Sequence, residues 1–224
     1  MNYEVISFDI FQTLVDVNRR IPQIWRGILK DQYTDEKARE GAEAVLGALP
    51  AVYKNAVQSE RFLTMAEFYR ICAEKAAERL NFYVSPDEVA YHLMLEHSRA
   101  PFYPEVIGCM AKLSTRFRII LSSDSSHLMV DGLIDKVPYE KAFISDDLKS
   151  YKGNPQGKFF NSVLETLDMP AEKIIHIGDS AADILGARRA GIASCWINRN
   201  DRPWRREIKP DFVIRSFYDL EKIV

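Results

Sequence analysis

The residues best suited to chemistry in this 224-residue chain stand at the ends of short apolar runs. They are carboxylates, hydroxyls and one lysine, namely Asp9 and Thr13, Ser122 and Ser123, Lys152, and Asp179 and Asp183. A carboxylate oxygen can attack an electrophile and form a covalent intermediate, which divides one difficult displacement into two easier ones. Carboxylates also supply the oxygen ligands that Mg²⁺ prefers. The set predicts nucleophilic chemistry beside a divalent cation, provided that the fold brings its members together.

The apolar runs themselves are typical of buried parallel strands. They cover residues 5–8, 118–121, 143–145, 173–177, 193–197 and 211–214, and patterns with helical spacing lie between them at 104–113, 155–167 and 180–190. Alternating strands and helices predict an α/β fold with a Rossmann-like parallel sheet, covered by helices on both faces. Ligands bind beyond the carboxyl ends of such strands, so the polar residues are expected to converge on one sheet edge.

Residues 17–96 have a different character, because they are rich in helix formers and contain no convincing strand. Thr64 with Glu67 matches a capping box, and Ser85 followed by Pro86 is typical of a helix start. A helical block between the first strand and the rest of a sheet indicates an insertion. We expect a discontinuous α/β core domain at 1–16 and 97–224, with an inserted all-helical cap domain at 17–96.

Four segments, in this order, resemble the motifs of the haloacid dehalogenase (HAD) superfamily of hydrolases. They are "SFDIFQTLVD", "IILSSDSS", "LKSYKGNPQGKFF" and "IIHIGDSAADILGARRAGI", and the last is the most specific. The helical insertion after the first motif is similar to a cap type of that family. The resemblance covers nearly the whole chain and implies a hydrolase that works through a covalent aspartyl intermediate.

The resemblance also assigns roles to individual residues. Asp9 would be the nucleophile, positioned by Thr13. Mg²⁺ would be bound by Asp9, the backbone carbonyl of Phe11 and Asp179, with Asp183 close by to orient a metal-bound water or Lys152. The nonbridging oxygens of a phosphate would be bound by three side chains: Lys152, Ser122 and the neighbouring Ser123.

Phe11 departs from the phosphatase pattern of this family. In those enzymes the residue two positions after the nucleophile is usually an Asp that protonates the leaving oxygen and then activates water. Phe11 cannot transfer a proton, and a positioned acid or base commonly contributes about 10²–10⁴ in rate. Gln12 also replaces a glycine that is often found next in the motif.

Three interpretations remain open. The first is a Mg²⁺-dependent phosphatase whose substrate has a good leaving group, or brings its own acid or base. The second is a metal-independent 2-haloacid dehalogenase, because an aromatic residue at position 11 is similar to those enzymes and a halide needs no proton. Its carboxylate-binding cap arginine has no clear match, so Lys37 or Arg39 would have to serve. The third is a weakly active or noncatalytic binding protein on the same scaffold.

The overall composition limits the partners and the cellular compartment that we expect for the protein. The formal net charge of −2 gives no general attraction to nucleic acid or to anionic membranes. Neither a secretory signal nor a membrane-spanning run is visible. Cys72, Cys109 and Cys195 are scattered, as is typical of buried thiols in a reducing compartment. We therefore expect a cytoplasmic enzyme that acts on a small molecule, as a monomer or homodimer, without nucleic-acid or membrane partners.

The positions of two histidines in the sequence predict their surroundings. His176 sits inside an apolar strand pattern, so we predict a hydrogen-bonded core histidine. His127 follows the second motif, where a helix start is the favoured prediction and a substrate contact the alternative. Asp124, in the same loop, is predicted to cap that helix or to face the site.

Overall fold

The computed structural model describes residues 3–59 and 61–224, and six strands of this part form one parallel sheet. The sheet order is β3-β2-β1-β4-β5-β6. The strands are β1 (Val5–Phe8), β2 (Arg118–Ser123), β3 (Lys141–Ile144), β4 (Ile174–Gly178), β5 (Ala193–Ile197) and β6 (Phe212–Ile214). After β1 the chain builds the sheet outward through β2 and β3, then returns to the other side of β1 with β4. This reversal lies between two central strands, where open α/β sheets bind their ligands. The predicted Rossmann-like sheet is confirmed.

Helices cover both faces of the sheet. Along each strand, side chains alternate between the faces. Val5 packs with Phe159 on one face, under α8 (Lys158–Leu167) and α9 (Ala181–Arg189). On the other face, Phe8 stacks on Phe217, with ring centroids 5.1 Å apart. That face is covered by α5 (Val106–Leu113) and the 3-10 turn η5 (Phe217–Lys222).

The remaining short elements lie in the segments that connect the strands and the longer helices. They are α6 (His127–Val130) and α7 (Ser145–Leu148), and the 3-10 turns η1 (Val17–Arg20), η2 (Lys30–Gln32), η3 (Ile134–Lys136) and η4 (Ala171–Lys173). In the described part of the chain, no helix combines the length and the apolar character that crossing a membrane requires.

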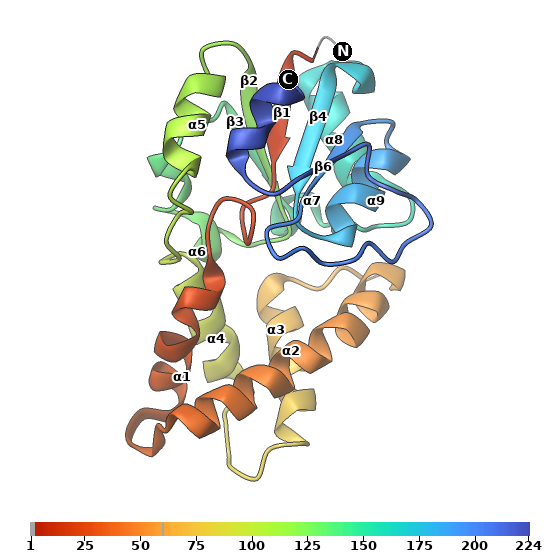
Figure 1. Ribbon diagram of the computed structural model, residues 1–224. Coiled ribbons are helices and arrows are strands. Elements are labelled where there is room, and N and C mark those ends of the chain that lie inside the picture. The colour runs from red at the N-terminus through yellow and green to blue at the C-terminus, as the bar shows by residue number, and fades with distance from the viewer. Residues whose placement is uncertain (1–2, 60) are drawn as a thin grey trace.

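Four helices form a separate layer beyond the carboxyl edge of the sheet (Figure 1). They are α1 (Ile21–Leu29), α2 (Asp35–Gln58), α3 (Met65–Ala77) and α4 (Pro86–His97). The predicted starts are confirmed, since Thr64 and Glu67 make a complete capping box and the Ser85 hydroxyl accepts from the Glu88 amide. This layer is the helical cap. The division of the chain at residues 16 and 97 stays a prediction.

Two hydrogen bonds join the start of α3 to the core outside the site. The Tyr151 hydroxyl donates to the carbonyl of Leu63 at 2.6 Å, and the amide of Met65 donates to Asp146 Oδ1 at 3.0 Å. Both contacts lie at the N-terminal end of α3. The cap thus rests directly on the loops that follow the strands.

Candidate active site

Asp9 is the first residue after β1 and is held from three sides. Its amide donates to the carbonyl of Ile177 at 2.9 Å, which fixes the backbone against β4. Thr13 Oγ1 donates to Asp9 Oδ2 at 2.9 Å, and Lys152 Nζ donates to Oδ1 at 2.5 Å. With only 4% of its surface exposed, Asp9 is a buried carboxylate with a fixed orientation. The structure thus brings together the three residues that the first and third motifs predicted.

Gln12 adopts the left-handed conformation, with φ of 61°, in the loop between Asp9 and Thr13. A residue with a Cβ pays about 1–2 kcal/mol for that conformation, which explains why glycine suits the position. Here the Gln12 side chain offsets part of the strain, because Oε1 accepts from the Val17 amide at 3.1 Å and from the Tyr103 hydroxyl at 3.4 Å. The loop keeps its shape without the glycine.

Asp179 and Asp183 enter the site from the turn between β4 and α9. Ser180 caps α9 and Asp183 returns the contact, so the pair forms a capping box. Asp183 approaches the backbone so closely that a Cβ on Gly178 would lie 2.2 Å from its carboxyl carbon. Glycine at position 178 is therefore required sterically, whatever its role in a motif.

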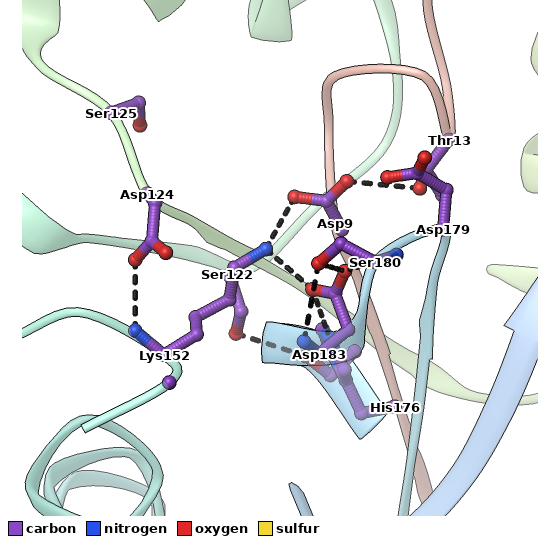
Figure 2. A network of polar contacts seen from close by, with 12 residues as sticks. Asp9, Thr13, Ser122, Asp124, Ser125, Lys152, His176, Asp179, Ser180 and Asp183 are labelled. Carbon is purple, nitrogen blue, oxygen red and sulfur yellow. Dashed lines mark hydrogen bonds and ion pairs between the residues drawn. The ribbon is translucent and has the colours of Figure 1, made fainter. Parts of the chain in front are cut away.

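Lys152 connects the two acidic motifs. Its Nζ lies between Asp9 Oδ1 and Asp183 Oδ1 and donates to both (Figure 2). The lysine is 3% exposed, and its backbone packs against α9 where a Cβ on Gly186 would meet the Lys152 carbonyl at 2.2 Å. Lys149, the competing candidate in the sequence, instead places its ammonium 5.8 Å from the centre of the Phe62 ring.

Burial and like charge dominate the electrostatics. Loss of solvent raises the pKa of Asp9 to about 8, with Asp183 and Asp179 adding to the rise and Lys152 opposing it. Loss of solvent and the charge of Asp183 likewise raise the pKa of Asp179 to about 6. Burial also disfavours the ionised form of Asp183, but Lys152 and His176 outweigh it and hold its pKa well below the ordinary value. The cluster holds more negative charge than Lys152 alone compensates.

Three carboxylates of this cluster are close enough to share one cation. One oxygen from each of Asp9, Asp179 and Asp183 lies within 4.8 Å of the others. The oxygens of Asp183 already accept from Lys152, His176 and Ser180, so Asp183 is more constrained than the other two. Asp9 and Asp179 are therefore the stronger metal-ligand candidates, and Asp183 mainly orients Lys152.

The two serines expected to contact a phosphate lie on opposite sides of β2. Ser122 Oγ lies 2.9 Å from the Oγ of Ser7, in the layer under α8 and α9, and Ser122 is not among the residues that line the cavity. Ser123, one residue later, lines the cavity at the sheet edge, and its buried Oγ has no hydrogen-bond partner in the described part of the chain. The phosphate contacts of both serines stay predictions.

Asp124 is a site residue that was predicted only as one of two alternatives. Its Oδ1 accepts from the Lys152 amide at 2.8 Å, and its Oδ2 accepts from the Tyr53 hydroxyl of α2 at 3.1 Å. The same tyrosine oxygen accepts from the Gly153 amide at 3.2 Å. Burial raises the pKa of Asp124 to about 6. No helix-capping role is observed. Tyr53 was not singled out by the sequence.

His127 and His176 have the surroundings that the sequence predicted, and His176 in addition contacts a residue of the site. His127 begins α6 on the surface, between Asp131 and Asp147, and does not line the cavity. His176 is a buried, hydrogen-bonded residue of β4, yet it also reaches the site. Its Nδ1 lies 2.8 Å from Ser7 Oγ and its Nε2 lies 3.0 Å from Asp183 Oδ1.

A cavity of about 500 Å³ lies between the sheet edge and the cap helices α2, α3 and α4. Asp9, Lys152, Asp179 and Asp183 line it on the sheet side. Phe11 lines it as well, with its ring edge-on to His97 and the ring centroids 4.8 Å apart. The missing second carboxylate is thus replaced by an aromatic contact between core and cap.

The site and the fold agree with a known family. Residues 3–191 match the family model of the haloacid dehalogenase-like hydrolases, and the chain belongs to that family. Pyrophosphatase PpaX of Halalkalibacterium halodurans is 24% identical over 226 residues, which cover 100% of this chain and 98% of that protein. The protein is therefore a hydrolase of the HAD superfamily, as the motifs predicted.

Two solved structures of differently named hydrolases have a fold similar to that of this chain. The HAD-hydrolase YfnB from Bacillus subtilis, bound to magnesium, has a TM-score of 0.82 and 20% identity, covering 100% of this chain and 99% of that one. The L-2-haloacid dehalogenase from Xanthobacter autotrophicus has a TM-score of 0.78 and 17% identity, covering 99% and 98%. Core and cap therefore have a shared architecture across hydrolases with different names.

Proposed function

We propose that this protein is a Mg²⁺-dependent phosphatase that acts on a small phosphorylated metabolite through an aspartyl intermediate on Asp9. The observation that carries the proposal is the cluster of Asp9, Asp179 and Asp183 around one buried lysine. A pyrophosphatase relative and a magnesium-bound structural neighbour support the same choice. The free cysteines fit the cytoplasmic location that we propose with it.

The donor set fits magnesium. Three carboxylates and one ammonium leave a formal charge of −2 when all four groups are ionised (−3 + 1), which a divalent cation would balance. All the candidate ligand atoms are oxygens, as Mg²⁺ prefers. Asp9, Asp179 and the carbonyl of Phe11 would hold the ion. When bound, it supplies neutralisation of the charge on the phosphate beside the nucleophile.

The protein groups then act in two displacements. An Asp9 oxygen attacks phosphorus, the ester P–O bond breaks, and its electron pair leaves with the alcohol oxygen. Water next attacks phosphorus and breaks the bond to Asp9, which releases phosphate. Thr13 holds the nucleophile in place throughout. Lys152 compensates the charge that builds up on the phosphoryl oxygens. Ser123, one of the two serines expected to contact the phosphate, donates its buried hydroxyl, which has no partner among the described residues.

Phe11 restricts which esters can react. The leaving oxygen receives no proton from position 11, so a substrate whose alcohol is a stable anion reacts most readily. Asp124 and His97 line the same cavity, but neither occupies the position of the missing acid. We therefore expect fast turnover of aryl or acyl phosphates and slow turnover of simple alkyl phosphates.

Metal-independent dehalogenation is the second candidate, favoured by the aromatic residue at position 11 and by the dehalogenase neighbours in fold. The cavity gives it little support. Lys37 and Arg39, the cap cations that were considered for binding a carboxylate, are not among the residues that line the cavity. Asp179 and Asp183, which lie beside the nucleophile, would also repel a haloacid anion.

The two candidates separate in one assay. Hydrolysis of p-nitrophenyl phosphate is measured with saturating Mg²⁺ and in EDTA. Chloride release from 2-chloropropionate is measured in parallel under the same two conditions. We expect phosphatase activity that requires Mg²⁺ and is lost in Asp9→Asn. Chloride release in EDTA without any phosphatase activity refutes the proposal. Absence of both activities in the folded protein favours the noncatalytic alternative.

A further inference from the structure

The cavity above the phosphate site has two chemically different halves. The sheet side carries the charged groups, whereas the seven lining residues from α2, α3 and α4 are mostly apolar or aromatic. They are Leu49, Pro50, Tyr53, Met65, Phe68, Tyr69 and His97. A substrate whose phosphate lies beside Asp9 therefore places its organic half against these cap residues.

Aromatic rings brace one another on this side of the cavity. The ring centroid of Phe68 lies 5.5 Å from that of Tyr69, 6.4 Å from that of Tyr53 and 6.3 Å from that of Tyr151. Tyr53 and Tyr151 are themselves 5.5 Å apart. Hydrogen bonds of both tyrosines to neighbouring segments fix their rings. Such a wall is rigid, flat-sided and suited to stacking against another ring.

Charge excludes another class of substrate. Among the described residues that line the cavity, none from the cap helices is a lysine or arginine. The imidazole of His97 is buried, and its Nδ1 lies 2.6 Å from the carbonyl of Leu93 in its own helix. The cavity arginines, Arg189 and Arg206, belong to the core and are exposed. A carboxylate placed against the cap would lose its water without gaining a cationic partner.

We propose that the substrate is a phosphate monoester whose organic half is uncharged and contains an aromatic ring, which packs against Tyr53, Phe68 and Tyr69. This inference rests on the proposed phosphatase function and adds the substrate class. A cavity of about 500 Å³ has room for a ring system beyond the phosphate, since pockets for such ligands measure about 300–1,000 Å³. Small acidic phosphates of similar reactivity are excluded.

Matched phosphate esters test the two parts of the inference with Mg²⁺ present. Phenyl phosphate and 4-carboxyphenyl phosphate have similar leaving groups and differ in one negative charge. Benzyl phosphate and ethyl phosphate are both primary alkyl esters and differ in the ring. We expect kcat/KM to be about 10-fold or more higher for the first member of each pair. Equal values, or the reverse order, overturn the inference while the phosphatase function stands.

A charge placed in the cap gives an independent check. Leu49→Lys puts an ammonium on the cap side of the cavity, and we expect it to shift the ratio of kcat/KM toward 4-carboxyphenyl phosphate by about 10-fold. Leu46→Lys is the matched control, because Leu46 lies one turn away on α2, is 55% exposed and does not line this cavity. An unchanged ratio in folded Leu49→Lys contradicts the proposed position of the organic half.

Binding separates a failure of this inference from a failure of the function. Calorimetry with two nonhydrolysable probes, benzylphosphonate and ethylphosphonate, requires no turnover. Tighter binding of benzylphosphonate by about 10-fold supports the substrate class even if no ester is hydrolysed, in which case only the phosphatase proposal fails. Equal or weaker binding of benzylphosphonate overturns the substrate class.

Discussion

Asp179→Asn is expected to have opposite effects on stability without and with Mg²⁺. Asp179 belongs to the acidic cluster, with its side chain 20% exposed and Arg202 as its only ion-pair partner among the described residues. Burial and the charge of Asp183 raise its pKa from 3.8 to about 6. The ionised carboxylate is therefore unfavourable in the folded protein unless a cation is bound.

The size of the effect follows from proton linkage. A carboxyl group whose pKa rises on folding destabilises the folded state as pH increases, with the full cost present above the folded pKa. For a rise from 3.8 to about 6, the cost at pH 8 is on the order of 3 kcal/mol. This cost is a net value that already includes the favourable ion pair to Arg202, and asparagine removes it in full. In EDTA, Asp179→Asn should be about 3 kcal/mol more stable than the wild type.

Magnesium should reverse the order. A ligand that binds only the folded state at about 1,000 times its Kd adds about 4.1 kcal/mol to stability, or about 8–16 °C in Tm for a chain of this size. The wild type should gain this increment. The variant lacks one of the two stronger ligand candidates and should gain little. The two melting curves should therefore exchange order when Mg²⁺ is added.

Differential scanning calorimetry at pH 8 measures both conditions, with urea unfolding as a second probe. Asp147→Asn is the control, because that carboxylate is 53% exposed and pairs with His127 on the surface. It should leave the Mg²⁺ increment unchanged. An equal increment in Asp179→Asn, or an apo variant less stable than the wild type, refutes the charge argument and the metal site with it.

Substitutions at four further positions test the other parts of the site and fold. Asp9→Asn should abolish phosphatase turnover while circular dichroism stays native, and residual activity would remove Asp9 as the nucleophile. Phe11→Asp should raise kcat/KM for ethyl phosphate by about 10²-fold or more. Phe11→Asn is its control, and equal values for the two would show that proton transfer is not the limiting defect. Gln12→Ala keeps the left-handed strain and loses both hydrogen bonds of the side chain, so urea unfolding should show a loss of about 1 kcal/mol. Gln12→Gly should lose less, and the reverse order contradicts the strain argument. Burial opposes ionisation of Glu96, but hydrogen bonds from Arg20 and Arg99 outweigh the effect of burial and lower the pKa of this carboxyl. The ionised Glu96 therefore stabilises the folded state above its unfolded pKa of about 4.3, and this stabilisation is lost as pH falls through the lower folded pKa. Glu96→Gln should flatten stability against pH in that acid range, and an unchanged slope would exclude this contribution.

Much of the architecture was predictable because it is encoded locally. Each strand is an apolar run that forms the buried sheet, and the starts of α2, α3, α4 and α9 carry their own side-chain caps, such as Thr64 with Glu67. Parallel strands place their carboxyl ends at one edge, so Asp9, Lys152 and Asp179 were expected to meet before any coordinates were known. Their meeting depends on strand order, which the alternating pattern already restricts.

The two serines of β2 show what the sequence could not predict. Ser122 and Ser123 have the same chemistry and differ by one position, and only the register of β2 in the sheet sends one under α8 and the other into the cavity. Tyr53 and Asp124 meet across 71 residues of sequence, through the packing of a cap helix on a strand-end loop. No pattern within either segment indicates that contact.

The sequence by itself determined the sheet, the helical insertion, the position of the carboxylate that we propose as nucleophile and the lack of a titratable group at position 11, because each depends on residue type and spacing along a few turns or strands. Tertiary structure alone decided which of the two serines lines the cavity, how Lys152 is shared between Asp9 and Asp183, and that the described cap residues at the cavity are rings and apolar groups without a lysine or arginine. These features arise where distant segments pack together, and burial there sets both the charge of each group and the surface that a substrate meets.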